Sequence, residues 1–166
     1  NNQVYDEWIV RDQGAMVRQI GYSPKEFAKI MIEKEGGLAQ AKKLFDKNDL
    51  KPSSYLPLPV KMNSVGEQYS KILTNIFEEN YDFKDYNRAS NIFWPSNKLG
   101  HGREDVNKLW NSLKNIFTDI KFSIEHVGYL DEPMKNPRAS IRWFLEGVHA
   151  RDSETYGYKT NSKLFI

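Results

Sequence analysis

The clearest pattern in the chain is an alternation of apolar and polar positions over residues 138–149. Side chains of a β-strand point to opposite faces with period two, so the alternation predicts one long strand with a mostly apolar face. A strand of this length rarely lies flat, and we expect the sheet to be curved and to bend near Gly147. The apolar face comprises Ala139, Ile141, Trp143, Leu145, Gly147 and His149.

A second alternation covers residues 121–129, where Phe122, Ile124 and His126 share one face. Residues 130–137 connect this stretch to the long strand, which predicts that the two strands form an antiparallel pair. Further strands are predicted at residues 4–12, 91–94 and 164–166, and a turn at residues 97–102.

Apolar residues recur at helical spacing over residues 64–79 and again over residues 103–117. Each of these stretches therefore predicts an amphipathic helix with one buried side. The pair Ser23 and Glu26, with proline between them, has the spacing of a capping box and predicts the start of another helix. Shorter helices are expected at residues 13–20, 38–49 and 82–89.

The order of these elements predicts an α+β fold in which helices cover one face of a curved, mainly antiparallel sheet. Residues 51–61 contain three prolines, which remove backbone donors and disfavour helix in the preceding residues. We therefore expect a linker at residues 51–61 between an N-terminal part, residues 1–50, and a domain at residues 62–166.

Composition excludes several classes of function. A net charge of +2, with Lys and Arg spread along the 166 residues, indicates no basic face for nucleic acid. No apolar run approaches the roughly 18 residues that a membrane span requires. The absence of cysteine excludes disulfides and is typical of a cytoplasmic protein. The three histidines lack metal-ligand spacing, and no nucleotide or flavin motif is present, so we expect neither metal nor cofactor.

Several short motifs follow one another in the C-terminal part: Gly102-Arg103-Glu104, Phe117-Thr118-Asp119, Arg142-Trp143, Gly147-Val148-His149 and Tyr156-Gly157-Tyr158-Lys159-Thr160. Together with the order of helices and strands, they resemble the SnoaL-like polyketide cyclases of the nuclear transport factor 2-like superfamily. The sequence departs from the family at Thr118, where a proline is common, and at Asn161, where a glycine is common. The resemblance implies a strongly curved sheet wrapped by helices to form a cone-like cavity.

The N-terminal residues carry a second part of the same resemblance. Glu7-Trp8, Asp12 and Gln19-Ile20-Gly21 are similar to the last strand and following helix of a SnoaL-like domain, although they precede the domain here. This implies either the C-terminal end of an upstream module in a tandem-module parent, or a first strand that replaces the missing last one. In the second case residues 4–12 would pair with residues 138–149 or 164–166, within one molecule or by strand exchange in a homodimer.

The resemblance also implies a catalytic site. Asp12 would be the acid/base group of an intramolecular aldol closure, and His149 would bind or protonate a substrate oxygen. From the residues alone, Asp12 can equally cap the helix at residues 13–20, and His149 can be a buried structural histidine. The apolar lining of the pocket is expected to comprise Trp8, Phe122, His126, Ile141, Trp143 and Leu145.

Two hypotheses of function follow. The first is a cofactor-independent cyclase or isomerase that acts on a small hydrophobic carbonyl compound through Asp12 and His149. The second is a non-catalytic module of the same fold that binds a ligand or forms dimers. An open cavity holding both Asp12 and His149 would favour the first, and a cavity plugged by Trp8, Trp143 or Phe122 would favour the second.

Overall fold

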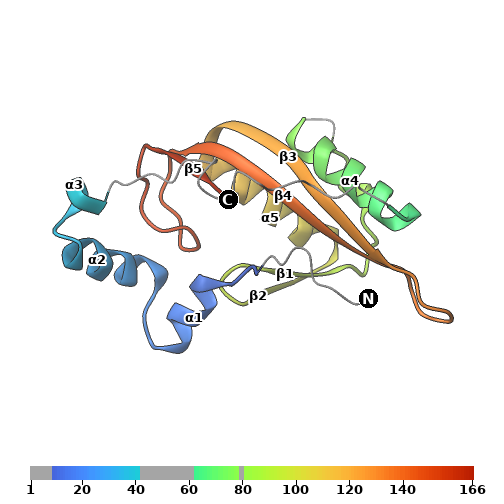
Figure 1. The fold of residues 1–166 in the computed structure, drawn as a ribbon, viewed down its shortest axis with the longest axis horizontal. Coiled ribbons are helices and arrows are strands. Elements are labelled where there is room, and N and C mark those ends of the chain that lie inside the picture. The colour runs from blue at the N-terminus through green and yellow to red at the C-terminus, as the bar shows by residue number, and fades with distance from the viewer. Residues whose placement is uncertain (1–8, 42–61, 79–80) are drawn as a thin grey trace, which may run out of the picture.

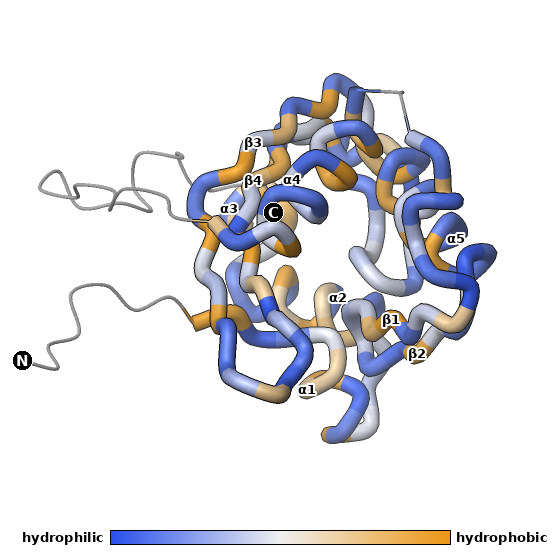
Figure 2. Tube along the Cα trace, turned by 90° about the vertical axis from the view of Figure 1, so that its right-hand side faces the viewer, coloured by the Kyte–Doolittle hydropathy of each residue, from blue (hydrophilic) through white to orange (hydrophobic). Residues whose placement is uncertain are grey.

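The chain is an α+β protein with two antiparallel sheets, seen in a computed structural model that describes residues 9–41, 62–78 and 81–166 (Figure 1). The larger sheet has the strand order β3-β4-β5, and the smaller one is the pair β1-β2. Figures 1 and 2 both place β1, β2 and the first helix below the larger sheet. The predicted α+β class is confirmed, but the larger sheet is not strongly curled.

The long strand that the alternation predicts is confirmed as β4, Arg138–His149. It lies in the middle of the larger sheet, between β3, Phe117–Leu130, and β5, Lys163–Phe165. The predicted antiparallel pairing with the preceding strand is also confirmed, with Phe122 opposite Leu145 and Ile124 opposite Trp143. Both strands therefore turn their apolar residues to the same side.

The core lies on this apolar face of the sheet. Leu145 of β4 packs with residues of α4, Ser64–Phe77, and α5, Gly102–Ile116, and His149 at the end of the strand is also buried. Both helices present apolar stripes to the sheet, because their apolar residues recur every three or four positions. The buried core consists of Ile72, Leu73, Ile76, Val106, Trp110, Leu113, Ile116, Phe117 and Leu145.

A bulge in β3 corrects the predicted placement of His126. The register shifts between Ile124 and His126, so that His126 lies opposite Arg142 rather than opposite an apolar residue. One extra residue in a strand moves all later side chains to the other face. Val127 occupies the buried side instead and is almost fully buried. His126 therefore lies on the face opposite Trp143 and does not line the apolar side of the sheet.

A second irregularity lies beside Gly147, where a bend was predicted. The register shifts in the partner strand, between Thr118 and Lys121, and Asp119 there has a left-handed backbone with φ of 52°. Gly147 allows the strands to approach closely, because a Cβ at this position would lie 3.2 Å from both the Cβ of Phe117 and the carbonyl oxygen of Thr118. The shift does not reverse His149, which still faces the core.

The smaller sheet corrects the predicted turn at residues 97–102. Strand β1, Asn91–Trp94, has the predicted bounds, but it pairs with a second strand, β2, Lys98–His101. The reversal occurs earlier, at residues 95–97, where Ser96 and Asn97 both have positive φ. Left-handed residues at a two-strand reversal give the twist that a tight hairpin requires.

The described N-terminal part is helical, with α1, Gln13–Gln19, α2, Pro24–Lys34, and α3, Leu38–Ala41. The predicted capping box of Ser23 and Glu26 is present in full.

The predicted strand at residues 4–12 is wrong for residues 9–12, which form no strand, and residues 4–8 lie outside the described part. The predicted linker at residues 51–61 and the end of the helix expected at residues 38–49 also lie outside it. A short 3-10 helix, Phe83–Asp85, occupies part of the helix expected at residues 82–89.

Candidate functional site

The predicted apolar wall is present, but aromatic side chains fill the space in front of it. Phe77 of α4 stacks on Phe122 of β3, with ring centroids 4.4 Å apart. Trp143 of β4 contacts Phe122 at 5.7 Å and Trp110 of α5 at 6.4 Å. Leu145 is fully buried, and Ile141 packs against the same core. These predicted lining residues therefore belong to a packed core between the sheet and its two helices.

His149 lies at the inner end of this core, where only 1% of its surface is exposed. Its ring stacks on Phe117 with centroids 5.3 Å apart, and neither ring nitrogen has a partner at normal hydrogen-bond geometry among the described residues. Burial lowers the pKa of His149, and the nearby backbone of Arg151 and carboxylate of Asp152 offset only part of this effect. The histidine is therefore neutral at pH 7, and among the described residues it lacks the hydrogen-bonded neighbour that a buried structural histidine usually has.

Asp12 caps α1, which is one of the two roles predicted for it from the sequence. Its carboxylate accepts hydrogen bonds from the backbone N–H of Ala15 at 2.8 Å, of Ser96 at 3.0 Å and of Asn97 at 3.2 Å. The carboxylate therefore fastens the start of α1 to the β1-β2 turn. Its slight burial raises the pKa of Asp12, but the backbone donors together outweigh this and leave the pKa below the ordinary value.

Among the described residues, the two predicted catalytic residues, Asp12 and His149, have no hydrogen-bonding or stacking partner in common. Asp12 contacts the β1-β2 turn, whereas His149 contacts Phe117 and the residues that follow β4. Trp8, which the sequence places in the pocket lining, lies outside the described residues. His126 is on the outer side of the bulged strand, as described above.

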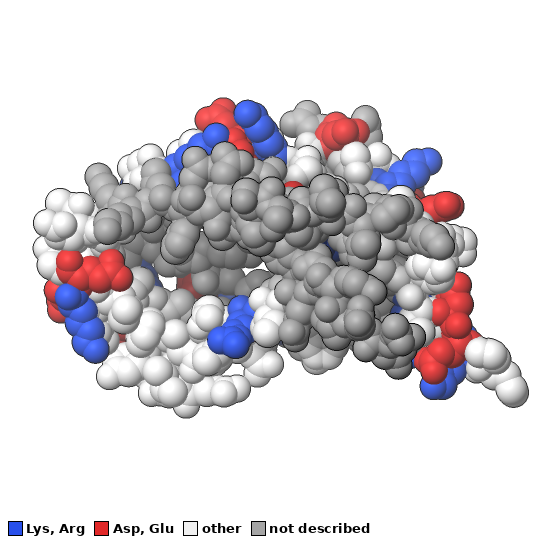
Figure 3. Space-filling model, in the orientation of Figure 1, with Lys and Arg blue, Asp and Glu red and all other residues white. Residues whose placement is uncertain are grey.

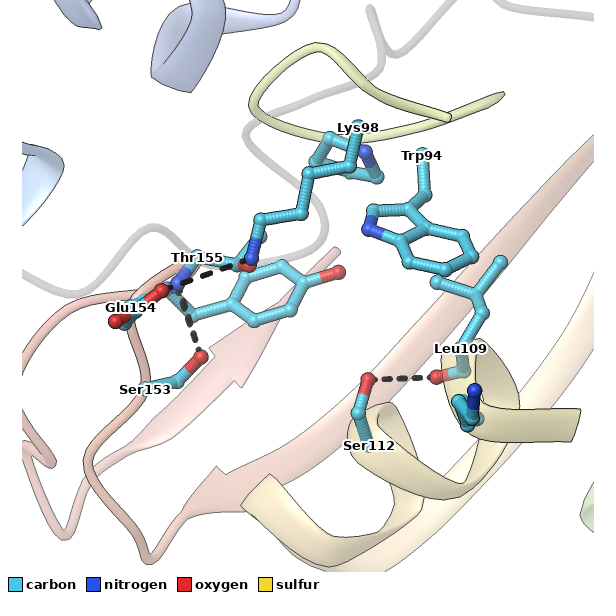
Figure 4. A pocket seen from close by; sticks show the side chains of 10 residues that line it. Trp94, Lys98, Leu109, Ser112, Ser153, Glu154 and Thr155 are labelled. Carbon is cyan, nitrogen blue, oxygen red and sulfur yellow. Dashed lines mark hydrogen bonds and ion pairs between the residues drawn. The ribbon is translucent and has the colours of Figure 1, made fainter. Parts of the chain in front are cut away.

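A pocket of about 260 Å³ lies elsewhere, between the β1-β2 hairpin, α5 and the loop that follows β4 (Figure 4). Trp94 and Lys98 are cross-strand partners, so both side chains leave the hairpin on the side that faces α5. Leu109 and Ser112 lie one helical turn apart and form the opposite wall. The full lining is Trp94, Pro95, Lys98, Lys108, Leu109, Ser112, Ser153, Glu154, Thr155 and Tyr156. We call this the hairpin pocket.

Local structure positions the aromatic walls of the hairpin pocket. Gly100 makes room for the Trp94 ring, because a Cβ at Gly100 would lie 2.8 Å from that ring. On the other side, Ser153 accepts hydrogen bonds from the backbone N–H of Thr155 and Tyr156 and so holds the loop in a tight turn. The Tyr156 ring packs edge-on against Phe117, with centroids 5.8 Å apart, which anchors this wall to the core.

The hairpin pocket also has polar groups in or beside its lining. Lys98 forms an ion pair with Glu154 at 3.8 Å, and Lys108 binds Asp105 at 2.9 Å. Burial raises the pKa of Tyr156, and the negative charge of Asp12 raises it further. Its hydroxyl is therefore protonated at neutral pH and can donate a hydrogen bond. Ser112 donates its hydroxyl proton to the carbonyl of Leu109 at 2.7 Å and keeps its lone pairs free to accept.

A second hollow of about 230 Å³ lies between α4 and β3. It contains one residue of the predicted lining, Phe122, together with its stacking partner Phe77. The other members of the predicted apolar lining that the structure describes do not line it. The complete set is Thr74, Phe77, Glu78, Ile120, Phe122, Ser123 and Ile124.

Sequence reasoning missed the hairpin pocket, although part of its signal was present. Tyr156 belongs to one of the motifs that carry the family resemblance, and Trp94 ends a predicted strand. The two residues are 62 positions apart in the sequence, and α5 separates them along the chain. Only the tertiary structure brings them to one pocket.

On the face drawn in Figure 3, the described charged side chains do not gather by sign. In the view of Figure 3, acidic and basic side chains lie next to one another at the edges of the molecule. Within the described residues, no group of three or more His, Asp or Glu side chains has the arrangement of a metal site. No helix there is long and apolar enough to cross a membrane.

Comparisons with protein-family models, with curated proteins and with solved structures find no match for this chain. The SnoaL-like resemblance therefore stays a prediction from the sequence.

Proposed function

We propose that residues 62–166 form a SnoaL-like module that binds a small molecule in the hairpin pocket and does not transform it. This is the second of the two hypotheses that the sequence raises. In this proposal the cone-like space typical of the family is occupied by protein side chains. The ligand then sits between the β1-β2 hairpin and α5, at one side of the core.

The observation that carries the proposal is the aromatic packing in front of the sheet. Phe77, Trp110, Phe122 and Trp143 contact one another across the space that a substrate of a SnoaL-like cyclase would need. Protein interiors are close-packed, so a ligand could enter this space only if several of these rings moved together. The hairpin pocket requires no such rearrangement.

The state of the two proposed catalytic groups gives further support. A general base that removes a proton next to a carbonyl works best with a raised pKa in an apolar site. Backbone donors instead hold the pKa of Asp12 below its ordinary value. His149 is buried behind Phe117, and its lowered pKa disfavours the charged form. Asp12 has a structural role as the cap of α1, and His149 is buried in the core.

A binding experiment with simple probes tests this proposal. Phenol, benzamide and benzoate would each be titrated into ¹⁵N-labelled protein, up to about 10 mM, because single-ring compounds bind weakly. We expect at least one of them to shift the amide signals of Leu109, Ser112 and Tyr156 and the indole signal of Trp94. The spectrum of the bound compound should stay unchanged after prolonged incubation.

Two leucine variants on neighbouring positions of β1 provide the matched pair. Trp94→Leu removes a wall of the pocket and should abolish the shifts. Phe93→Leu alters the exposed face of the same strand and should leave them intact. The proposal is wrong if no probe shifts the pocket signals, or if the shifts map onto Phe122 and Trp143 instead.

Dimer formation is the second candidate, and the outer face of the hairpin favours it. Phe93 and Leu99 are cross-strand partners that are 78% and 65% exposed. Adjacent exposed apolar side chains on a sheet are typical of interaction surfaces. Sedimentation velocity of the wild type and of the double variant Phe93→Ser, Leu99→Ser would test this. A concentration-dependent dimer that the double variant loses supports the proposal, and a wild-type monomer at all concentrations refutes it.

A further inference from the structure

The charge arrangement in the hairpin pocket indicates which class of molecule it takes. Two ammonium groups and one carboxylate line the pocket, those of Lys98, Lys108 and Glu154. Lys108 is paired with Asp105, and the carboxylate of Asp12, which lies near Tyr156, is held by backbone donors. These charges compensate one another, so an anion would have to be bound by one lysine and not by a general excess of positive charge.

The two lysines differ in how firmly their charge is engaged. Lys108 holds Asp105 at 2.9 Å, and that carboxylate is fixed in turn by the backbone N–H of His101 at 3.0 Å. Among the described residues, Lys98 has the longer contact of 3.8 Å with Glu154, whose side chain is 86% exposed. Ion pairs between such exposed groups contribute little to stability and are readily exchanged. Lys98 is thus the cation that an incoming anion can recruit.

The apolar residues that line the rest of the pocket favour a flat apolar group, such as an aromatic ring, next to that anion. Trp94 presents its indole ring, and Leu109 lies across from it on α5 (Figure 4). A volume of about 260 Å³ is below the range of pockets for drug-sized ligands, which indicates a compound with a single ring. In Figure 4 the Lys98 side chain extends away from Trp94 and toward Glu154, so the charged contact lies to one side of the apolar one.

We propose that the hairpin pocket binds a small aromatic carboxylate, whose ring packs between Trp94 and Leu109 and whose carboxylate replaces that of Glu154 on Lys98. The inference rests on the proposed binding function and adds the chemical class of the ligand. It makes Glu154 an internal competitor, because its carboxylate occupies the position that the ligand needs. Removing this competitor should therefore strengthen binding, which a merely structural role of Glu154 would not do.

Benzoate and benzamide distinguish charge from shape, since they differ little in size and only benzoate is an anion. We expect the wild type to bind benzoate more tightly than benzamide, with an affinity for benzoate that falls as sodium chloride is raised. Glu154→Gln should bind benzoate about threefold more tightly, in line with the small energy of an exposed pair. Lys98→Gln should weaken benzoate about tenfold and leave benzamide unchanged.

The control variants remove the same charges elsewhere. Glu67→Gln and Lys71→Gln alter exposed positions on α4, and neither should change benzoate binding by more than the error of the titration. If they reproduce the effects of Glu154→Gln and Lys98→Gln, the net charge of the protein is responsible and the inference is wrong. It is also wrong if the wild type binds benzamide as tightly as benzoate, a result that leaves the proposed binding function in place. If neither compound shifts the pocket signals, the inference is wrong, and if phenol does not shift them either, the binding function itself is refuted.

Discussion

Truncation of Leu145 tests whether the apolar face of the larger sheet is a packed core or an open pocket. Leu145 is fully buried at the centre of the larger sheet. Its backbone is held on one side by β3 and on the other by Ile166, through hydrogen bonds of 2.9 Å in both directions. The strand therefore cannot move inward to fill the space that Leu145→Ala would leave.

The expected cost follows from this burial. Loss of three buried carbon groups removes roughly 2.4 kcal/mol at about 0.8 kcal/mol each. The unfilled cavity adds to this, and fully buried leucines of this kind cost about 3 to 4 kcal/mol in total. For a protein of this size such a loss lowers the melting temperature by roughly 10 °C.

Urea unfolding followed by tryptophan fluorescence measures this cost, with Leu99→Ala as the matched control. Leu99 lies on the exposed face of the β1-β2 hairpin, so the same substitution there should change stability by less than about 0.5 kcal/mol. The slope of the unfolding free energy against urea should be unchanged in both variants. If Leu145→Ala lowers the free energy of unfolding by no more than Leu99→Ala does, the core is not packed at this position. The apolar face of the larger sheet would then again be a candidate ligand site.

Two further predictions concern the residues that the sequence placed in a catalytic site. Asp12→Ala removes the cap of α1 and its link to the β1-β2 turn, and should cost about 1 kcal/mol at pH 7 by urea unfolding. Because the pKa of Asp12 is lowered in the folded state, its contribution to the free energy of unfolding is present above the ordinary value of 3.8 and is lost as the pH falls below it. If wild type and variant differ in stability by the same amount at pH 2.5 and at pH 7, this reasoning is contradicted. The lowered pKa of His149 makes the unfolded state bind protons first, so the stability of the wild type should decrease as the pH falls below about 6.5. The variant His149→Gln should show a weaker decrease between pH 7 and pH 5, and an unchanged pH profile would show that His149 does not titrate in this range.

The sequence by itself determined the elements whose signal is local and repeated. The alternation over residues 138–149 has the bounds of β4, and the apolar spacing over residues 103–117 predicts α5 to within one residue at each end. The capping box at Ser23 is present because its hydrogen bonds join residues three positions apart. In each case the interactions that fix the element lie within the element, so the pattern of its residues suffices.

The tertiary structure decided every feature that depends on partners far along the chain. The bulge that turns His126 outward is set by pairing with β4. Aromatic rings from four elements fill the space at the apolar face of the larger sheet. The hairpin pocket forms only because Trp94 and Tyr156, which are distant in the sequence, lie close together. An alternating pattern shows which side of a strand is apolar. Whether that side contacts a ligand or other side chains depends on how much of the space in front of it the side chains of neighbouring elements fill.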